Sequence, residues 1–219
     1  NAEGQLGDGT ATNRSTPVQA ATGVGQISAG YFHSLFLKTD GTLWAIGYNE
    51  YGQLGDGTTT SRSLPVRVLS EIASVATGHG HALFVKTDGT LWATGYNAYG
   101  QLGNGTTTNR FTPEQVATGV SVLAAKDAHS LYLKTDGALW AMGNNLTGQL
   151  GDGTTTSRAF PTAVLGLTDV ASISVGYSQS CALLVDGTAR CWGSNTFGQL
   201  GDGTGVDRTT PVAVSGLTG

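Results

Sequence analysis

The segment Gly52-Gln53-Leu54-Gly55-Asp56-Gly57-Thr58 decides the fold, because it recurs along the whole chain. Copies with Asp or Asn at the fifth position begin at Gly4, Gly52, Gly100, Gly148 and Gly198. Their spacings are 48, 48, 48 and 50 residues. A fixed period of this length is typical of a repeat architecture, so we expect a series of similar structural units.

Between consecutive copies of this segment the same four short runs recur. In the first unit they cover residues 17–20, 26–29, 33–38 and 42–46, and Asp40-Gly41 lies between the last two. Asp-Gly between alternating runs favours a tight hairpin, because both residues tolerate positive φ. The dipeptide returns as Asp88-Gly89, Asp136-Gly137 and Asp186-Gly187. Four short strands in a unit of this length predict an all-β propeller blade.

The composition excludes several other classes of protein. There are 34 glycines among 219 residues without a Gly-X-Y period, which excludes collagen. The net charge of −4 and the scattered lysines and arginines lack the concentrated positive surface that nucleic-acid binding requires. No apolar stretch is long enough for membrane insertion. Helical repeats are excluded because apolar residues do not recur at helical spacing.

Each unit resembles a repeat of the RCC1 (regulator of chromosome condensation) family. The residues that carry the resemblance are Ala29-Gly30-Tyr31-Phe32-His33-Ser34-Leu35, Asp40-Gly41, Trp44 to Gly55, and, in the fourth unit, Cys191-Trp192-Gly193-Ser194-Asn195. The resemblance covers the whole chain. It implies an RCC1-like β-propeller of four-stranded antiparallel blades, usually seven in number.

The chain is expected to be a single array with four repeats of about 48 residues. The units cover about 16–63, 64–111, 112–159 and 160–210, with partial repeats at 1–15 and 211–219. Four units supply sixteen strands, and Pro211–Val214 would add a seventeenth with an unpaired edge. We therefore expect a piece of a longer propeller, as the start at Asn1 inside a motif also suggests, or edges capped by another chain. The alternative is a four-bladed ring that one terminus closes.

Cys181 and Cys191 lie on either side of the Asp186-Gly187 turn, in the positions of Leu35 and Ala45 of the first unit. Facing positions of a hairpin are close enough for a disulfide, which is the prediction. Two buried free thiols are the alternative. A disulfide would place the protein outside a reducing cytosol, so we expect an extracellular or cell-surface setting.

The residues that usually carry chemistry show only the repeat pattern here. His33, His81 and His129 share one repeat position, and we expect each ring to hydrogen-bond backbone within its blade. His79 lies outside that pattern and is expected to face the other way. The loop acids Asp8, Asp56, Asp152 and Asp202, with Asn104, precede glycine and favour turns rather than a Ca²⁺ site. No catalytic residue, cofactor or metal site is therefore predicted.

The turns that follow runs 26–29 and 42–46, and their equivalents, are expected to emerge on one face. Aromatic and variable residues gather there, and tyrosine gives large contact area at low entropic cost. The predicted protein-binding residues are Tyr31, Phe32, Tyr48, Glu50, Tyr51, His79, Tyr96, Tyr99, Lys126, Asp127, Leu146, Tyr177 and Phe197. Lys126-Asp127 is the sharpest departure, because two charges replace the Gly-Tyr of the first unit.

The leading functional hypothesis is a non-enzymatic protein-binding scaffold of a secreted or cell-surface protein. One alternative is a structural or self-assembling extracellular repeat protein, whose partners would be copies of itself. Another is a secreted enzyme inhibitor of the β-lactamase-inhibitor type, which the family resemblance implies. A guanine-nucleotide exchange factor is the least favoured alternative, because the constant repeat spacing leaves no room for an inserted wedge.

Overall fold

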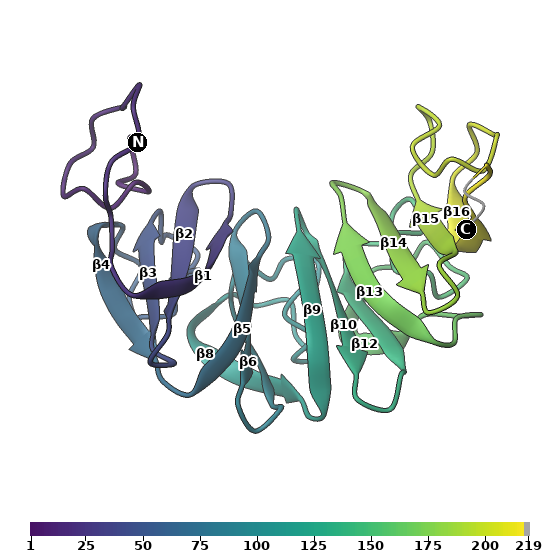
Figure 1. Cartoon of the computed structure of the whole chain (residues 1–219), viewed down its shortest axis with the longest axis horizontal. Helices are drawn as coiled ribbons and strands as arrows, with labels where there is room; N and C mark the ends of the chain where they lie inside the picture. Colours follow the sequence, from purple (N-terminus) through teal and green to yellow (C-terminus); the bar gives the residue numbers. More distant parts are fainter. Residues whose placement is uncertain (217–219) are drawn as a thin grey trace.

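A computed structural model describes residues 1–216, which form sixteen β-strands arranged as four antiparallel sheets (Figure 1). The first sheet contains β1 (Val24–Ala29), β2 (His33–Lys38), β3 (Leu43–Gly47) and β4 (Arg62–Leu69). The second contains β5 (Ile72–Thr77), β6 (His81–Lys86), β7 (Leu91–Gly95) and β8 (Arg110–Ala117). The third contains β9 (Val120–Lys126), β10 (His129–Lys134), β11 (Leu139–Gly143) and β12 (Arg158–Ala163). The fourth contains β13 (Val170–Val175), β14 (Gln179–Leu184), β15 (Ala189–Gly193) and β16 (Arg208–Ala213).

The all-β propeller fold is thus confirmed. Within residues 1–216 no helix is long and apolar enough to cross a membrane.

The predicted Asp-Gly hairpins form in every sheet. In the first, Gly41 has a φ of 78° and the Asp40 carboxylate accepts a hydrogen bond from the Thr42 amide at 2.9 Å. This turn sets the register that pairs Phe36 with Trp44. Because the register is fixed, alternate side chains of β2 are buried and the sheet presents one apolar face to the next.

The fourth strand of each sheet comes from the run that follows the long loop, not from the run that precedes the innermost strand. β4 pairs with β3, with Gly47 opposite Arg62 and Ala45 opposite Val66. The spare seventeenth strand is therefore a wrong prediction, because Pro211 belongs to β16 and completes the fourth sheet. Residues 17–20 precede the first sheet, so they have no earlier sheet to join, and they do not form a strand. Residues 217–219 of the predicted last partial repeat lie outside the described residues.

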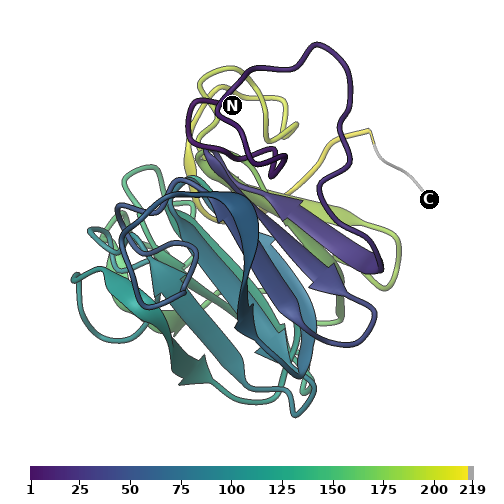
Figure 2. The same cartoon turned by 90° about the vertical axis from the view of Figure 1, so that its left-hand side faces the viewer.

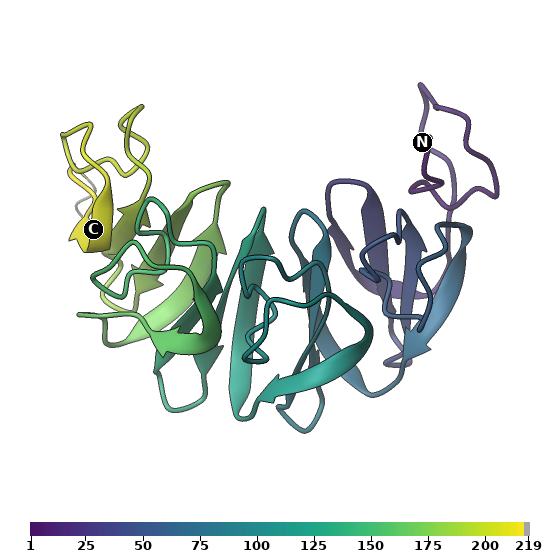
Figure 3. The same ribbon diagram turned by 180° about the vertical axis from the view of Figure 1, so that it is seen from behind.

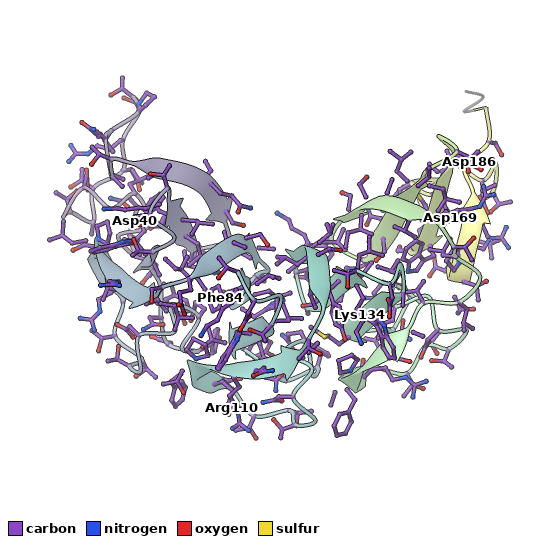
Figure 4. The ribbon with its side chains drawn as sticks, turned by 60° about the horizontal axis from the view of Figure 1, so that its bottom comes forward. Asp40, Phe84, Arg110, Lys134, Asp169 and Asp186 are labelled. Atoms are coloured by element: carbon purple, nitrogen blue, oxygen red, sulfur yellow. A yellow bond between two sulfur atoms is a disulfide. The ribbon has the colours of Figure 1, made fainter. Side chains whose placement is uncertain are left out.

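The four sheets follow one another in an open arc, with β1, β5, β9 and β13 as neighbouring inner strands (Figure 1). Seen from its end, the first sheet lies in front of the others (Figure 2). Asp40 and Asp186 occupy equivalent turns of the first and last sheets and lie at opposite ends of the arc (Figure 4). The described residues therefore form an arc rather than the closed four-bladed ring.

Apolar side chains fill the space between successive sheets. Leu35 and Leu43 of the first sheet pack with Phe84 of the second, which is fully buried. Leu83 of the second packs with Tyr132 of the third, and Leu131 of the third with Trp192 of the fourth. These three cores join the sheets into one body, because burying apolar area is the main favourable term in folding.

The predicted disulfide is present. Cys181 and Cys191 are opposite each other in the β14–β15 register, and their sulfur atoms are bonded. Their positions in the other sheets are held by Leu and Ala, which pack against the following sheet. The disulfide therefore lies on the face of the fourth sheet that points away from the third.

The three repeated histidines are buried between sheets, and their bonding differs from the prediction. His81 Nε2 lies 2.8 Å from Ser130 Oγ of the next sheet, and His129 Nε2 lies 3.0 Å from Ser180 Oγ. The expected bond to backbone within the blade is thus wrong: His81 and His129 bond the neighbouring sheet, and neither ring nitrogen of His33 has a hydrogen-bond partner. Burial lowers the pKa of His129 to about 4 and that of His81 to about 3, so both are neutral near pH 7.

Candidate functional site

The long loop of each repeat is closed by a buried asparagine. Asn49 is fully buried, and its side-chain nitrogen donates hydrogen bonds to Asp56 Oδ1 and to the Thr58 and Thr60 carbonyls at 3.1–3.2 Å. Its side-chain oxygen accepts a bond from the Leu54 amide. Asn97, Asn145 and Asn195 repeat this arrangement. The loops are therefore rigid supports, since every polar atom of the asparagine side chain is satisfied.

The repeated loop acid holds the same loop from the other side, as the turn interpretation predicted. Asp56 accepts bonds from Thr58, and its second oxygen pairs with Arg62 at 2.7 Å. Burial opposes ionisation of Asp56, but the bonds from Thr58 and Arg62 prevail and lower its pKa. Within residues 1–216 no group of three potential ligands is placed to hold a metal ion.

Two sets of loops meet on one face of the arc. The Tyr48 amide donates to the Phe32 carbonyl at 2.8 Å, which ties the long loop of the first sheet to its β1–β2 turn. The same backbone bond joins residues 96 and 80, 144 and 128, and 194 and 178. The view from behind shows the long loops passing in front of the strands (Figure 3). The structure thus brings together the two loop sets that were predicted to share a face.

Seven of the predicted residues form a continuous line of ring contacts, here called the aromatic row. His79 stacks on Tyr31 with ring centroids 4.4 Å apart, and Tyr51 lies 4.9 Å from Tyr96. The remaining links are edge-on contacts of 4.4–6.5 Å. In order, the aromatic row is His79, Tyr31, Phe32, Tyr48, Tyr51, Tyr96 and Tyr99. Rings in mutual contact lose little further entropy when a partner binds, so the row is a preorganised surface.

Two hollows on this face share Tyr51, His79 and Gly80 in their linings. The larger, here called the tyrosine hollow, has a volume of about 360 Å³. It is lined by Tyr51, His79, Gly80, Tyr96, Tyr99, Asp127, Ala128, Asn144, Tyr177 and Ser178. The smaller, of about 270 Å³, is lined by Glu3, Phe32, Tyr48, Tyr51, Gln53, His79 and Gly80. The tyrosine hollow therefore joins loops of all four sheets, because its lining runs from Tyr51 to Tyr177.

Asp127 brings the one carboxylate to the lining of the tyrosine hollow. Its side chain is only 17% exposed, and burial raises the pKa of this group. The nearest side chain that could pair with it is His79, whose Nδ1 lies 3.7 Å away, beyond hydrogen-bond distance. The His79 amide donates to the Asp127 carbonyl at 2.9 Å, so the turns of the second and third sheets are joined directly.

A sequence model of the RCC1-like domain matches residues 1–219. The chain belongs to the RCC1-like domain family. The RCC1-like domain is similar to human WBSCR16, with 28% identity and a TM-score of 0.85 over 98% of this chain and 61% of that one. It is also similar to Prp20p of Saccharomyces cerevisiae, with 24% identity and a TM-score of 0.76 over 87% and 50% of the two chains. The RCC1-like domain thus spans less than two thirds of either relative. No curated protein sequence matches it.

The other predicted binding residues of the RCC1-like domain lie on the same loops but outside the aromatic row. Glu50 accepts a hydrogen bond from the Tyr48 hydroxyl at 2.7 Å, which raises the pKa of that tyrosine. Leu146 and Phe197 are exposed at the tips of the third and fourth long loops. Lys126 ends β9 and does not line either hollow.

Several lining residues of the RCC1-like domain were not among the predicted binding residues. They are Glu3, Gln53, Gly80, Ala128, Asn144 and Ser178. Gly80 shows why the tyrosine hollow is open: a Cβ built there would lie 3.2 Å from the Tyr51 ring and 3.3 Å from Tyr96 Cβ. The first repeat has Phe32 in this position. That change of size between repeats was the signal available in the sequence.

Proposed function

We propose that this RCC1-like domain is a non-catalytic protein-binding module that engages its partner through the aromatic row and the exposed loop tips beside it. The observation that carries the proposal is the line of seven rings, joined by six contacts, on one loop face. Exposed tyrosines on rigid loops favour binding, because aromatic anchors supply most of the energy of protein interfaces. Loops on a fixed scaffold are the usual place for such residues.

The proposal includes an extracellular or cell-surface setting. Its support is the Cys181–Cys191 disulfide, since such bonds persist in oxidising compartments and are rare in a reducing cytosol. Alkylating the protein as isolated from its source, under denaturing conditions, is expected to label neither cysteine. Labelling of both would count against this setting.

The partners of similar proteins support the proposal only by showing that this fold can bind proteins. Prp20p has binding properties toward Gsp1p and histones, and Kap60 binds yeast RCC1 (Prp20). At 24% and 23% identity these partners are not transferred to the present chain. What we carry over is the use of an RCC1-type propeller as a protein-binding scaffold.

Photo-crosslinking from two positions of the fourth sheet tests the proposal. Phe197 is 90% exposed on the proposed face, and Val185 is exposed in the β14–β15 turn at the other end of the same strands. A benzophenone amino acid in place of Phe197 is expected to crosslink one protein from the extracellular fraction of the source. The same group in place of Val185 is not. Equal crosslinking from both positions, or none from either, would refute the proposed face.

End-to-end assembly of copies is a second candidate, because both ends of the arc expose apolar residues that are buried inside it. Ile27 on the first sheet is 70% exposed, whereas Val75 at the same repeat position of the second sheet is 4% exposed. Leu183 on the outer face of the fourth sheet corresponds to the buried Val85 in the same way. Two copies would bury these faces as adjacent sheets do. Light scattering over a hundredfold range of concentration decides: a constant mass of 22.4 kDa excludes assembly.

A further inference from the structure

The tyrosine hollow combines electron-rich rings with one poorly hydrated carboxylate. We propose that it receives the ammonium group of a lysine side chain on the partner, with Asp127 as the counter-ion and the tyrosine rings as walls. This inference rests on the proposed binding function and names the chemistry by which the face recognises its partner. Lysine fits because it joins an apolar stem to a compact charge.

The walls of the tyrosine hollow favour a cation. Tyr51, Tyr96, Tyr99 and Tyr177 all line it. The negative face of a tyrosine ring attracts an ammonium group placed within about 6 Å of its centroid, and more strongly once water is excluded. The same chain already uses this contact elsewhere, since Lys38 and Lys86 lie 4.6 and 4.7 Å from the ring centroids of Trp44 and Trp92.

The Asp127 carboxylate lacks a strong partner of its own. Its side chain is mostly buried, and the His79 ring at 3.7 Å is half exposed and too distant for a hydrogen bond. A buried charge without a close counter-charge is unfavourable, and a bound ammonium group would offset that penalty. Asp127 also has a φ of 45°, a left-handed conformation that few residues adopt without cost. Tyr31, His79 and Tyr177 hold the equivalent positions, so only the third repeat brings a carboxylate here.

The charges around the tyrosine hollow are consistent with a cationic ligand. Among the described residues that line the two hollows there is no lysine or arginine, and Glu3 adds a second carboxylate in the smaller hollow. Lys126 precedes Asp127 and slightly weakens the negative potential. An acidic peptide would meet Asp127 and Glu3, so charge complementarity favours a basic one.

The size of the tyrosine hollow suits a single side chain. Pockets that enclose small molecules measure about 300–1,000 Å³, and about 360 Å³ is at the lower end of that range. A lysine stem would contact the rings while its ammonium group reaches Asp127. A protein partner would then place the rest of its surface on the aromatic row.

Binding of N-acetyl-lysine methylamide to the full chain tests the proposal, followed by the NMR signals of the tyrosine rings. The expected result is a saturable shift of Tyr96, Tyr99 and Tyr177, with affinity about tenfold above that of N-acetyl-norleucine methylamide, which lacks the charge. Asp127→Asn is expected to weaken lysine binding about fivefold. Asp169→Asn is the matched control, because Asp169 also has a left-handed backbone, with a φ of 56°, but precedes β13 at the strand end far from Tyr177.

Four outcomes would overturn the lysine site, three of which compare ligands or variants. Those three are equal binding of the norleucine amide, no effect of Asp127→Asn, and tighter binding of a neutral sugar or of N-acetyl-glutamate methylamide. Absence of a saturable shift at up to 100 mM N-acetyl-lysine methylamide would also overturn it. That concentration is on the order of a hundred times a Kd of about 1 mM, which is already weak binding. If crosslinking through position 197 persists in any of these cases, the binding face stands and only the lysine site fails.

Discussion

The interface between the first and second sheets lacks a hydrogen bond that the other two sheet interfaces share. His81 and His129 each bond a serine of the following sheet, whereas the residue that faces His33 at the same repeat offset is Ala82. Neither ring nitrogen of His33 has a hydrogen-bond partner, although the ring is buried. The comparison separates two roles of the repeated histidine, namely filling space and bonding across the interface.

Filling space is the role that both kinds of interface keep. A Cβ built at Gly30 would lie 2.2 Å from His33 Cε1, and one built at Gly78 would lie 2.0 Å from His81 Cε1. Each ring therefore lies directly on a glycine, with or without a serine opposite it. The hydrogen bond is an addition to this packing, which explains why the first interface tolerates an alanine.

The serine bond also fixes the histidine tautomer. Ser130 Oγ donates its proton to the Gln101 carbonyl at 2.9 Å, so the Ser130 oxygen accepts a hydrogen bond from the N–H of His81 Nε2. Ser180 bonds the Gln149 carbonyl in the same way and accepts from His129. The two interfaces that have the histidine–serine bond, here called complete interfaces, thus each hold a neutral histidine with its proton on Nε2.

Acid is expected to have the largest effect, because it removes the neutrality that all three interfaces share. Burial lowers the pKa of His33 and His129 to about 4 and that of His81 to about 3, from 6.5. The unfolded chain binds these protons near pH 6.5 and the folded chain only near pH 3–4. The free energy of unfolding should therefore fall as pH falls below 6.5, by about 4 kcal/mol per pH unit near pH 5.

Urea unfolding between pH 4.5 and 7.5 measures this slope. The control is His33→Gln, because glutamine occupies the same position naturally as Gln179. It should reduce the slope by about 1.4 kcal/mol per pH unit, the value for one proton. The aspartates with lowered pKa, such as Asp56, add to the loss only near and below their ordinary value of 3.8, and Asp127, whose pKa is raised, acts in the opposite direction. An unchanged slope in the variant would show that His33 is not buried as described.

Ser130→Ala should remove the histidine–serine bond between the second and third sheets, so that this interface resembles the one between the first and second sheets. The variant leaves His81 Nε2 and the Gln101 carbonyl without their partner, so unfolding should become easier by about 2 kcal/mol. Ser34→Ala is the control, because Ser34 bonds only the Gln5 carbonyl, at 3.2 Å. Urea denaturation at pH 7.5 compares the two. A larger loss in the control than in Ser130→Ala would contradict the role given to the serine bond.

Ala82→Ser should complete the first interface and stabilise the protein. The added hydroxyl would face His33 Nε2 as Ser130 faces His81, for a gain of about 1 kcal/mol in the free energy of unfolding. The rise is measured by the same urea titration, and the His33→Gln background serves as the control in which it should shrink. A loss of stability would mean that the site has no room for the hydroxyl.

The smallest expected effect is the coupling between Ala82→Ser and Ser130→Ala. The change in the free energy of unfolding of the double variant should differ from the sum of the two single changes by less than about 0.5 kcal/mol. The two positions lie in different interfaces, and stacked repeats are stabilised by nearest-neighbour terms that add. Four urea curves, for the parent, the two single variants and the double variant, measure the difference. A coupling of several times this size would show that the interfaces are not independent.

Much of the fold could be predicted because its signals are local. The Asp40-Gly41 turn and the symmetric placing of Cys181 and Cys191 around another turn gave the hairpins and the disulfide. Strand pairing across the long loop could not be predicted, because β3 ends at Gly47 and β4 begins only at Arg62, so no short turn marks the pair. The serine partner of His81 lies 49 residues away, so no local pattern indicates it.

The candidate site was predictable to the extent that large side chains mark it. The rings of the aromatic row stand out against the repeat background. Asn144 and Ser178 do not, because small polar residues are common in turns whether or not they line a hollow. Gly80 matters through the volume it leaves free, which only the placement of Tyr51 and Tyr96 reveals.

The buried asparagine that closes each long loop holds the loop backbone independently of the side chain at the loop tip. A repeated glutamine adds to this, since Gln53 accepts a bond from the Tyr51 amide as Gln199 does from the Phe197 amide. The backbone at these tips is thus held whatever side chain it carries, and Tyr, Tyr, Thr and Phe occur there in the four repeats. The side chain at a tip can therefore be exchanged while the backbone of its loop stays in place, although at Tyr51 such an exchange would also remove the ring contacts with Tyr48 and Tyr96.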